Sequence, residues 1–153
     1  MAESNSKPER KPQGTTGHQR TEARLLAVQA IYQVLLLRQS TADVLAEFSS
    51  YRIPGTGADS KLFSKIYEHA IADEERYQTL LTVQLSKKWS WDRLGLVEKA
   101  ILLAAAAEMD VCQTTPPKVI INEFLNIAHS FFEADEVSFV NGVLDKVRQA
   151  VRD

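Results

Sequence analysis

Eight consecutive residues in the second half of the chain carry no polar side chain, and they restrict the fold more than any other feature. The run Ala-Ile-Leu-Leu-Ala-Ala-Ala-Ala occupies residues 100–107. Leu94 and Val97 continue its helical spacing towards the N-terminus. A helix that is apolar all round has to be buried on every side. We therefore expect a central helix that other helices surround.

The segments before this run have the spacing of amphipathic helices. Apolar residues recur at intervals of three and four over residues 20–38, which predicts a first helix. Ser40 or Thr41 can cap a short second helix that extends through Tyr51. The segment 53–58, Ile-Pro-Gly-Thr-Gly-Ala, is the clearest loop because it concentrates residues that stop helices.

Helical spacing continues on both sides of the central run. Residues 59–85 predict two helices that are divided at the charged segment 73–76. Pro117 is well placed to begin another helix, and residues 137–151 form the last one, with the acidic pair 135–136 before it as a cap. No segment has the pattern of a strand. The sequence therefore predicts an all-α protein, a compact bundle of about seven helices with short connections.

The N-terminal end differs from the rest in composition and charge. Residues 1–17 contain no large aliphatic residue after Met1, so they cannot bury enough apolar surface to offset the entropy of ordering. We expect a flexible, disordered tail over 1–17 and a single all-helical RNA-binding domain over 18–153. Residues 1–24 carry five Lys or Arg against three Glu, which is net +2, whereas the whole chain is −2. A polyanion is attracted to this end.

Few residues suit catalysis. His18, His69 and His129 lie at the edge of the tail or among polar helix positions, and no basic residue is near Cys112 in sequence. No glycine-rich loop has the form of a nucleotide site, and no Cys/His group has metal-ligand spacing. We expect no enzyme, no cofactor and no metal. A single cysteine, no signal peptide and no apolar run of about 20 residues indicate a cytoplasmic protein outside the membrane.

Four separated blocks carry a family resemblance. They are RLLAVQAIY at 24–32, VEKAIL at 97–102, PKVIINE at 117–123 and FVNGVLD at 139–145. In this order they resemble the signature segments of the NusB family, small all-helical RNA-binding factors of bacterial transcription antitermination. The resemblance extends from about residue 20 to residue 148, which is most of the chain.

The resemblance implies that the start of the first helix binds single-stranded boxA RNA. Arg20 and Arg24 are four residues apart, so we expect both on one helix face, with Tyr32 two turns further on. Phe131 falls at the position of an aromatic residue that stacks on RNA in the family. Guanidinium groups suit phosphates and aromatic rings suit bases. The Thr-Glu pair at 21–22 interrupts the family's basic run, so we expect RNA binding to be weaker or more dependent on a partner.

The resemblance also implies a protein partner, NusE, a small-subunit ribosomal protein that serves in antitermination complexes. Glu108 ends the apolar helix, where a carboxylate opposes the helix dipole. We expect it to form the NusE surface together with Asp135 and Phe139. Leu103 and Ala107 occupy places where the family commonly has Arg and Tyr, so the contacts differ in detail. Whether the free protein is a homodimer stays open.

Four polar or small residues in the last two blocks have a simpler interpretation. Asn122, Glu123 and Asn141 are expected to be internal hydrogen-bonding groups that lock helices together. Gly142 lies inside a predicted helix, where glycine is destabilising by about 1 kcal/mol relative to alanine unless another backbone approaches closely. We assign it to packing.

The resemblance implies a transcription antitermination factor. With NusE it would bind boxA RNA, including ribosomal RNA leaders, and help to assemble a processive RNA polymerase complex. One alternative is a relative of the N-terminal RNA-binding domain of ribosomal RNA cytosine methyltransferases, which is less favoured because we expect no catalytic domain after residue 153. Another is a protein-only helical adaptor whose arginines are incidental.

Overall fold

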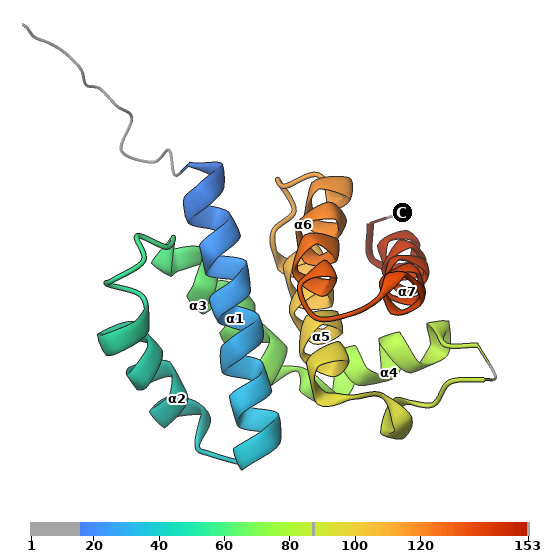
Figure 1. Cartoon of the computed structure of the whole chain (residues 1–153), viewed down its shortest axis with the longest axis horizontal. Helices are drawn as coiled ribbons and strands as arrows, with labels where there is room; N and C mark the ends of the chain where they lie inside the picture. The colour runs from blue at the N-terminus through green and yellow to red at the C-terminus, as the bar shows by residue number, and fades with distance from the viewer. Residues whose placement is uncertain (1–15, 87, 153) are drawn as a thin grey trace, which may run out of the picture.

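The computed structural model describes residues 16–86 and 88–152. Within them the chain forms seven α-helices and no strand, as predicted (Figure 1). Residues 1–15, which make up most of the predicted tail, lie outside the described part. The α-helices are α1 (Gly17–Leu37), α2 (Thr41–Glu47), α3 (Ser60–Ala72), α4 (Glu74–Gln84), α5 (Leu96–Val111), α6 (Pro117–His129) and α7 (Ala134–Arg152).

Helix α5 is the centre of the bundle. Every residue from Ala100 to Ala107 is fully buried. Helices α1 and α3 cover one side of α5, and α6, α7 and α4 cover the other (Figure 1). The prediction of a central, surrounded helix is confirmed, and its cause is the absence of any polar side chain that could face water.

Local sequence signals fix several of the helix ends. The hydroxyl of Thr16 accepts a hydrogen bond from the backbone N–H of Gln19, whose side chain accepts one from Thr16 N–H, so α1 begins with a capping box. Residues 16–17 therefore belong to the start of α1, which corrects the tail boundary predicted at residue 17. The side chain of Asp59 caps α3 by accepting a hydrogen bond from the backbone N–H of Leu62. The break between α3 and α4 falls at Asp73, within the charged segment that predicted it.

Two boundaries differ from the prediction. Helix α7 begins at Ala134, so Asp135 and Glu136 lie in its first turn instead of preceding it. Acidic side chains there interact favourably with the N-terminal end of the helix dipole. The second helix is in two parts, because a π-helical turn, Phe48–Arg52, continues from α2. Its Phe48 is fully buried and stacks on Phe63 of α3.

Helix α4 is joined to α5 by one polar cluster. The carboxylate of Asp110 accepts hydrogen bonds from Arg76 Nη2 at 2.6 Å and from the Tyr77 hydroxyl at 2.7 Å. Partial burial opposes the charge on Asp110, but these two hydrogen bonds outweigh it and lower the pKa of Asp110. Burial and the same hydrogen bond raise the pKa of Tyr77. The carboxylate therefore stabilises the fold in its ionised form.

This cluster predicts a specific response to acid. Because the pKa of Asp110 is lower in the folded chain than in the unfolded one, its contribution to stability is present above the ordinary value of about 3.9 and is lost as the pH falls through the folded-state value. We expect Asp110→Asn to be less stable at neutral pH and to lose less stability than the wild type between about pH 5 and pH 3. Urea unfolding across this range measures the difference. Parallel curves for the two proteins would contradict the assignment.

The packing roles predicted for three residues of α6 and α7 are wrong. Asn122 and Asn141 are exposed, and neither side chain has a hydrogen bond within residues 16–86 and 88–152. Gly142 is exposed too, and a Cβ atom placed on it would have no neighbour within 4 Å. These positions follow the polar faces of their helices, which the sequence motif alone did not separate from the buried faces. Glu123, the fourth residue for which an internal role was predicted, does form hydrogen bonds to another helix.

Among the described residues, no helix is both long enough and apolar enough to cross a lipid bilayer.

Candidate nucleic-acid interface

The side chain of Arg24 lies inside the bundle. Only 2% of the residue is exposed. Its Nε and Nη2 atoms donate to the two oxygens of Glu108 on α5, both at 2.8 Å, and Nη1 donates to Glu123 Oε1 on α6 at 2.9 Å. This is the two-pronged geometry in which a guanidinium and a carboxylate bind most strongly.

Charge balance keeps this buried group stable. Burial disfavours the charged guanidinium, but the hydrogen bonds and the attraction of Glu108 and Glu123 outweigh it, and the pKa of Arg24 is raised. Glu108 itself is 0% exposed. The expectation that Arg24 and Glu108 present their charges to RNA and to a protein partner is therefore wrong, because each is the other's partner in the interior.

The network also fixes the beginning of α1 against α6. Thr21, one turn before Arg24, donates its hydroxyl hydrogen to Glu123 Oε1 at 2.6 Å. The carboxylate of Glu123 thus receives hydrogen bonds from two successive turns of α1. The internal role predicted for Glu123 is confirmed. The residues that hold the predicted RNA-binding end of α1 in place are Arg24, Glu108, Glu123 and Thr21.

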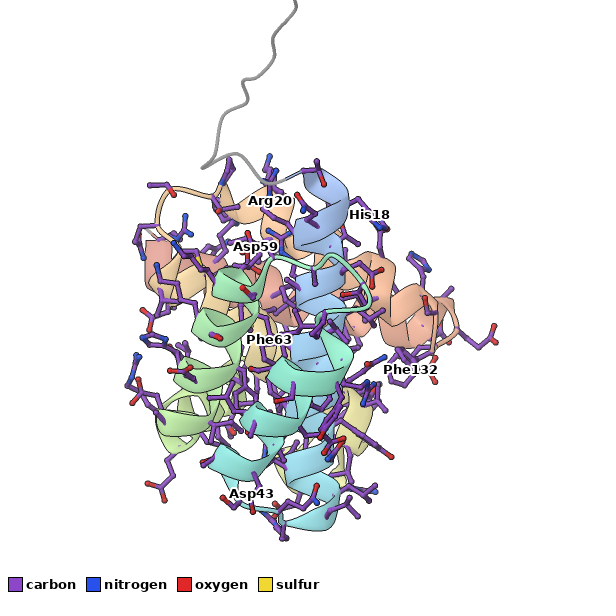
Figure 2. All side chains as sticks on the ribbon, turned by 90° about the vertical axis from the view of Figure 1, so that its left-hand side faces the viewer. His18, Arg20, Asp43, Asp59, Phe63 and Phe132 are labelled. Carbon is purple, nitrogen blue, oxygen red and sulfur yellow. The ribbon has the colours of Figure 1, made fainter. Side chains whose placement is uncertain are left out.

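Arg20 lies in a different environment from Arg24. Arg20 is partly exposed and lies in the first turns of α1, four residues before the buried Arg24. Figure 2 shows it with His18 at the end of the molecule where α1 begins, above the start of α3 at Asp59. The backbone N–H of Asp59 donates to Gln19 O at 3.0 Å and ties the preceding loop to α1. Arg20 is thus a cation at the edge of the bundle.

Tyr32 is at the other end of the same helix. It is partly buried and packs against the core. Twelve residues separate it from Arg20, which corresponds to about 18 Å along the helix axis. A single nucleotide therefore cannot contact both residues.

The predicted aromatic residues lie around the turn between α6 and α7. Phe131 follows the end of α6, is 50% exposed, and has its ring tilted against that of Phe132, 6.4 Å between centroids. Phe139 on α7 is partly buried, and its ring lies 4.6 Å from that of Trp89. Asp135 is exposed in the first turn of α7. Phe131, Asp135 and Phe139 are therefore close in sequence on a surface that is partly open to solvent.

Helix α6 connects the two predicted regions. Its Glu123 contacts the start of α1, and Phe131 lies eight residues further on, about 12 Å along the helix direction. The start of α1 thus contacts the middle of α6, and the turn to α7 follows the C-terminal end of the same helix. A flexible strand can contact both by following α6.

Other features of the structure do not suggest small-molecule chemistry. An open groove of about 760 Å³ beside the start of α3 is lined by residues that include Lys61, Lys65 and Cys112, and it contains none of the predicted site residues. Burial raises the pKa of the Cys112 thiol, which makes it less reactive. Among the described residues, no group of three or more His, Cys, Asp or Glu side chains could hold a metal ion.

Comparison with known proteins gives a consistent result. The sequence matches the model of the NusB family over residues 21–149. It is 37% identical to the transcription antitermination protein NusB of Bartonella tribocorum, over 90% of this chain and 92% of that protein. It is 34% identical to the NusB protein of a Bradyrhizobium species, over 99% of this chain and 96% of that one.

Solved structures give the same fold. The structure resembles a chain in the crystal structure of the antitermination factors NusB and NusE with double-stranded RNA, with a TM-score of 0.75 and 21% identity, covering 88% of this chain and 99% of that one. It also resembles the solution structure of NusB from Aquifex aeolicus, with a TM-score of 0.71 and 25% identity, covering 86% and 88%.

Proposed function

Because the chain belongs to the NusB family, we propose that it is a transcription antitermination factor. In this proposal it binds boxA RNA together with NusE, including the leaders of ribosomal RNA transcripts, and promotes processive transcription by RNA polymerase. The observation that carries the proposal is the agreement of family model and curated relatives over nearly the whole domain. The protein acts in the cytoplasm, by binding and without catalysis.

In this proposal the residues have different roles, which their exposure and contacts support. Arg20 supplies positive charge to phosphates at the start of α1, and Phe131 offers an exposed ring for base stacking. Tyr32 contacts a different nucleotide, because it lies far along α1. Asp135 and Phe139 form the part of the NusE surface that is accessible. Arg24 and Glu108 act indirectly, since their pair holds α1 against α5 and α6.

The charge distribution favours partner-dependent RNA binding. One cation of the expected pair, Arg24, is neutralised in the interior, so it cannot release counterions from RNA. The whole chain has a net charge of −2, which gives little general attraction for RNA. A basic partner that shares the RNA would supply the missing contacts.

Fluorescence anisotropy with a labelled boxA oligonucleotide tests this function. The chain alone is expected to bind weakly, and purified NusE is expected to raise the affinity at least tenfold, with an affinity that falls as salt rises. A scrambled oligonucleotide of the same length is the control for sequence preference. Two results together would favour the protein-only adaptor instead. They are that the chain alone does not bind the RNA even at low salt, and that adding NusE does not raise the RNA affinity.

A further inference from the structure

The outer face of α6 is mostly polar, and the one carboxylate of the helix accepts hydrogen bonds from α1. Its exposed residues include Lys118, Val119, Asn122, Asn126 and His129. The acidic residue of the helix, Glu123, points its carboxylate at Thr21 and Arg24 of α1. An anion that follows the outside of α6 therefore encounters amides, one lysine and one histidine, together with the apolar Val119 and a carboxylate that already has hydrogen-bond donors.

A cleft of about 210 Å³ lies between this face and α7. It is lined by Lys118, Ile121, Asn122, Asn141 and Asp145. Within the described part of the chain, the side chains of Lys118, Asn122 and Asn141 have no hydrogen-bond or ion-pair partner. Asp145 accepts hydrogen bonds from Arg148 at 3.0 and 3.1 Å, which offsets its charge.

The helices carry residues here that do not favour helix formation. Asparagine has a lower helix propensity than alanine, lysine or glutamate, and Asn122 and Asn141 have no internal contact that compensates. Gly142, next to Asn141, is exposed and has open space where its side chain would be. Nothing within the described chain requires these residue types. Unpaired amides beside an unobstructed stretch of backbone are suited to a close contact with another molecule.

We infer that the cleft between α6 and α7 binds a segment of single-stranded RNA. The inference rests on the proposed function and adds a place of contact to it. The amides of Asn122 and Asn141 can each both donate to and accept from a base edge, as asparagine does in the recognition of adenine. Lys118 lies at the start of α6 and neutralises a phosphate. Phe131, nine residues after Asn122 and thus about 13 Å further along the helix direction, stacks on another base of the same strand.

The lining of the cleft favours RNA over a protein chain. The centre of a protein interface is apolar and aromatic, whereas the one apolar residue of the cleft, Ile121, is 6% exposed. The accessible groups are amides and a lysine, together with the paired carboxylate of Asp145. Single-stranded RNA is recognised through unstacked bases that present hydrogen-bonding edges.

A double variant, Asn122→Ala with Asn141→Ala, tests the inference. Anisotropy titrations use the full chain, purified NusE and labelled boxA RNA. The variant is expected to bind RNA roughly tenfold more weakly or worse, in line with the loss of base-edge contacts. Its melting temperature should not fall, because both side chains are exposed and unpaired. Gln149→Ala, which removes an exposed amide from α7 outside the cleft, is the matched control and should bind as the wild type does.

A pair of lysine variants tests the phosphate contact separately. Lys118→Ala is expected to reduce the slope of the logarithm of affinity against the logarithm of salt by about one. Lys146→Ala removes the same charge from an exposed position of α7 outside the cleft and should leave the slope unchanged. Equal slopes for Lys118→Ala and the wild type would overturn the phosphate contact.

The outcomes separate this inference from the function on which it rests. If the wild type with NusE binds boxA RNA and the double variant binds equally well, the cleft is not an RNA contact and the proposed function stands. If the double variant loses affinity for NusE in the absence of RNA, the cleft is a protein contact and the inference is overturned. If the wild type does not bind RNA at all, both proposals fall.

Discussion

Arg24→Ala is expected to lower the free energy of unfolding by about 3–5 kcal/mol, because it leaves the carboxylate of Glu108 buried without its partner. For a domain of this size the melting temperature should fall by on the order of 10 °C. Glu123 also loses one of its two hydrogen-bond donors on α1 and keeps the Thr21 hydroxyl. Thermal and urea unfolding followed by circular dichroism measure the loss.

Two controls test whether the loss comes from an unpaired buried charge. Arg148→Ala breaks an i,i+3 ion pair with the half-exposed Asp145 and should cost no more than about 1 kcal/mol. Arg24→Met combined with Glu108→Leu removes both buried charges and should recover much of the stability. A melting temperature for Arg24→Ala that equals the wild-type value would show that Arg24 is not part of the structural network.

Phe131→Ala is expected to weaken RNA binding in the presence of NusE by roughly 5- to 150-fold, which corresponds to the loss of one stacked base, about 1–3 kcal/mol. Phe131 is half exposed and follows the end of α6, so its removal should change the melting temperature little. Anisotropy with boxA RNA and saturating NusE measures the effect. Phe131→Tyr retains the aromatic face and should bind nearly as the wild type does.

Tyr51→Ala is the matched control for this variant. Tyr51 is another highly exposed aromatic residue, but it lies in the π-helical turn after α2, on the other side of the bundle from α6 and α7 (Figure 1). Its removal should leave RNA affinity unchanged. Equal losses for Phe131→Ala and Tyr51→Ala would mean that RNA contacts exposed aromatic residues without preference, and the proposed site would be wrong.

The helices and their order could be predicted because their causes are local. The apolar run 100–107 had to be buried, Pro117 started α6, and the charged segment 73–76 marked the break between α3 and α4. Each of these signals is contained in a few neighbouring residues. The exact start of α7 could not be predicted, since acidic residues are favourable both before a helix and in its first turn.

The burial of Arg24 could have been predicted from its position on the helix face. Residues 24, 28, 31 and 35 follow one helix face, and Val28, Ile31 and Leu35 are all buried. An arginine in this series has to find a carboxylate in the interior. Glu108 carries the corresponding signal, because Ala104 and Ile101 precede it on the same face of α5. Arg24 and Glu108 meet because α1 packs on α5. They are far apart in the sequence, so no short segment of the sequence indicates their contact.

Two polar residues of the last two motifs were expected in the interior but lie at the surface, which is the reverse of the case of Arg24. Asn122 and Asn141 are expected from the sequence to be internal hydrogen-bonding groups that lock helices together, but both are exposed. Their neighbours Ile121 and Val140 are buried, but a helix turns by about 100° per residue, so the next position can face solvent. Which face of α6 and α7 is outside depends on where α5 lies. That information becomes available only from the assembled bundle.

Hydrogen exchange in the complex of the chain with NusE and boxA RNA tests the central claim, that RNA follows the surface from the start of α1 along α6 to α7. We expect protection upon adding RNA over residues 16–22, 118–131 and 134–145, with a further protected stretch of α1 around Tyr32, and no change over α2 and α3. Protection confined to α2 and α3, with α6 and α7 exchanging as in the RNA-free complex, would contradict the account.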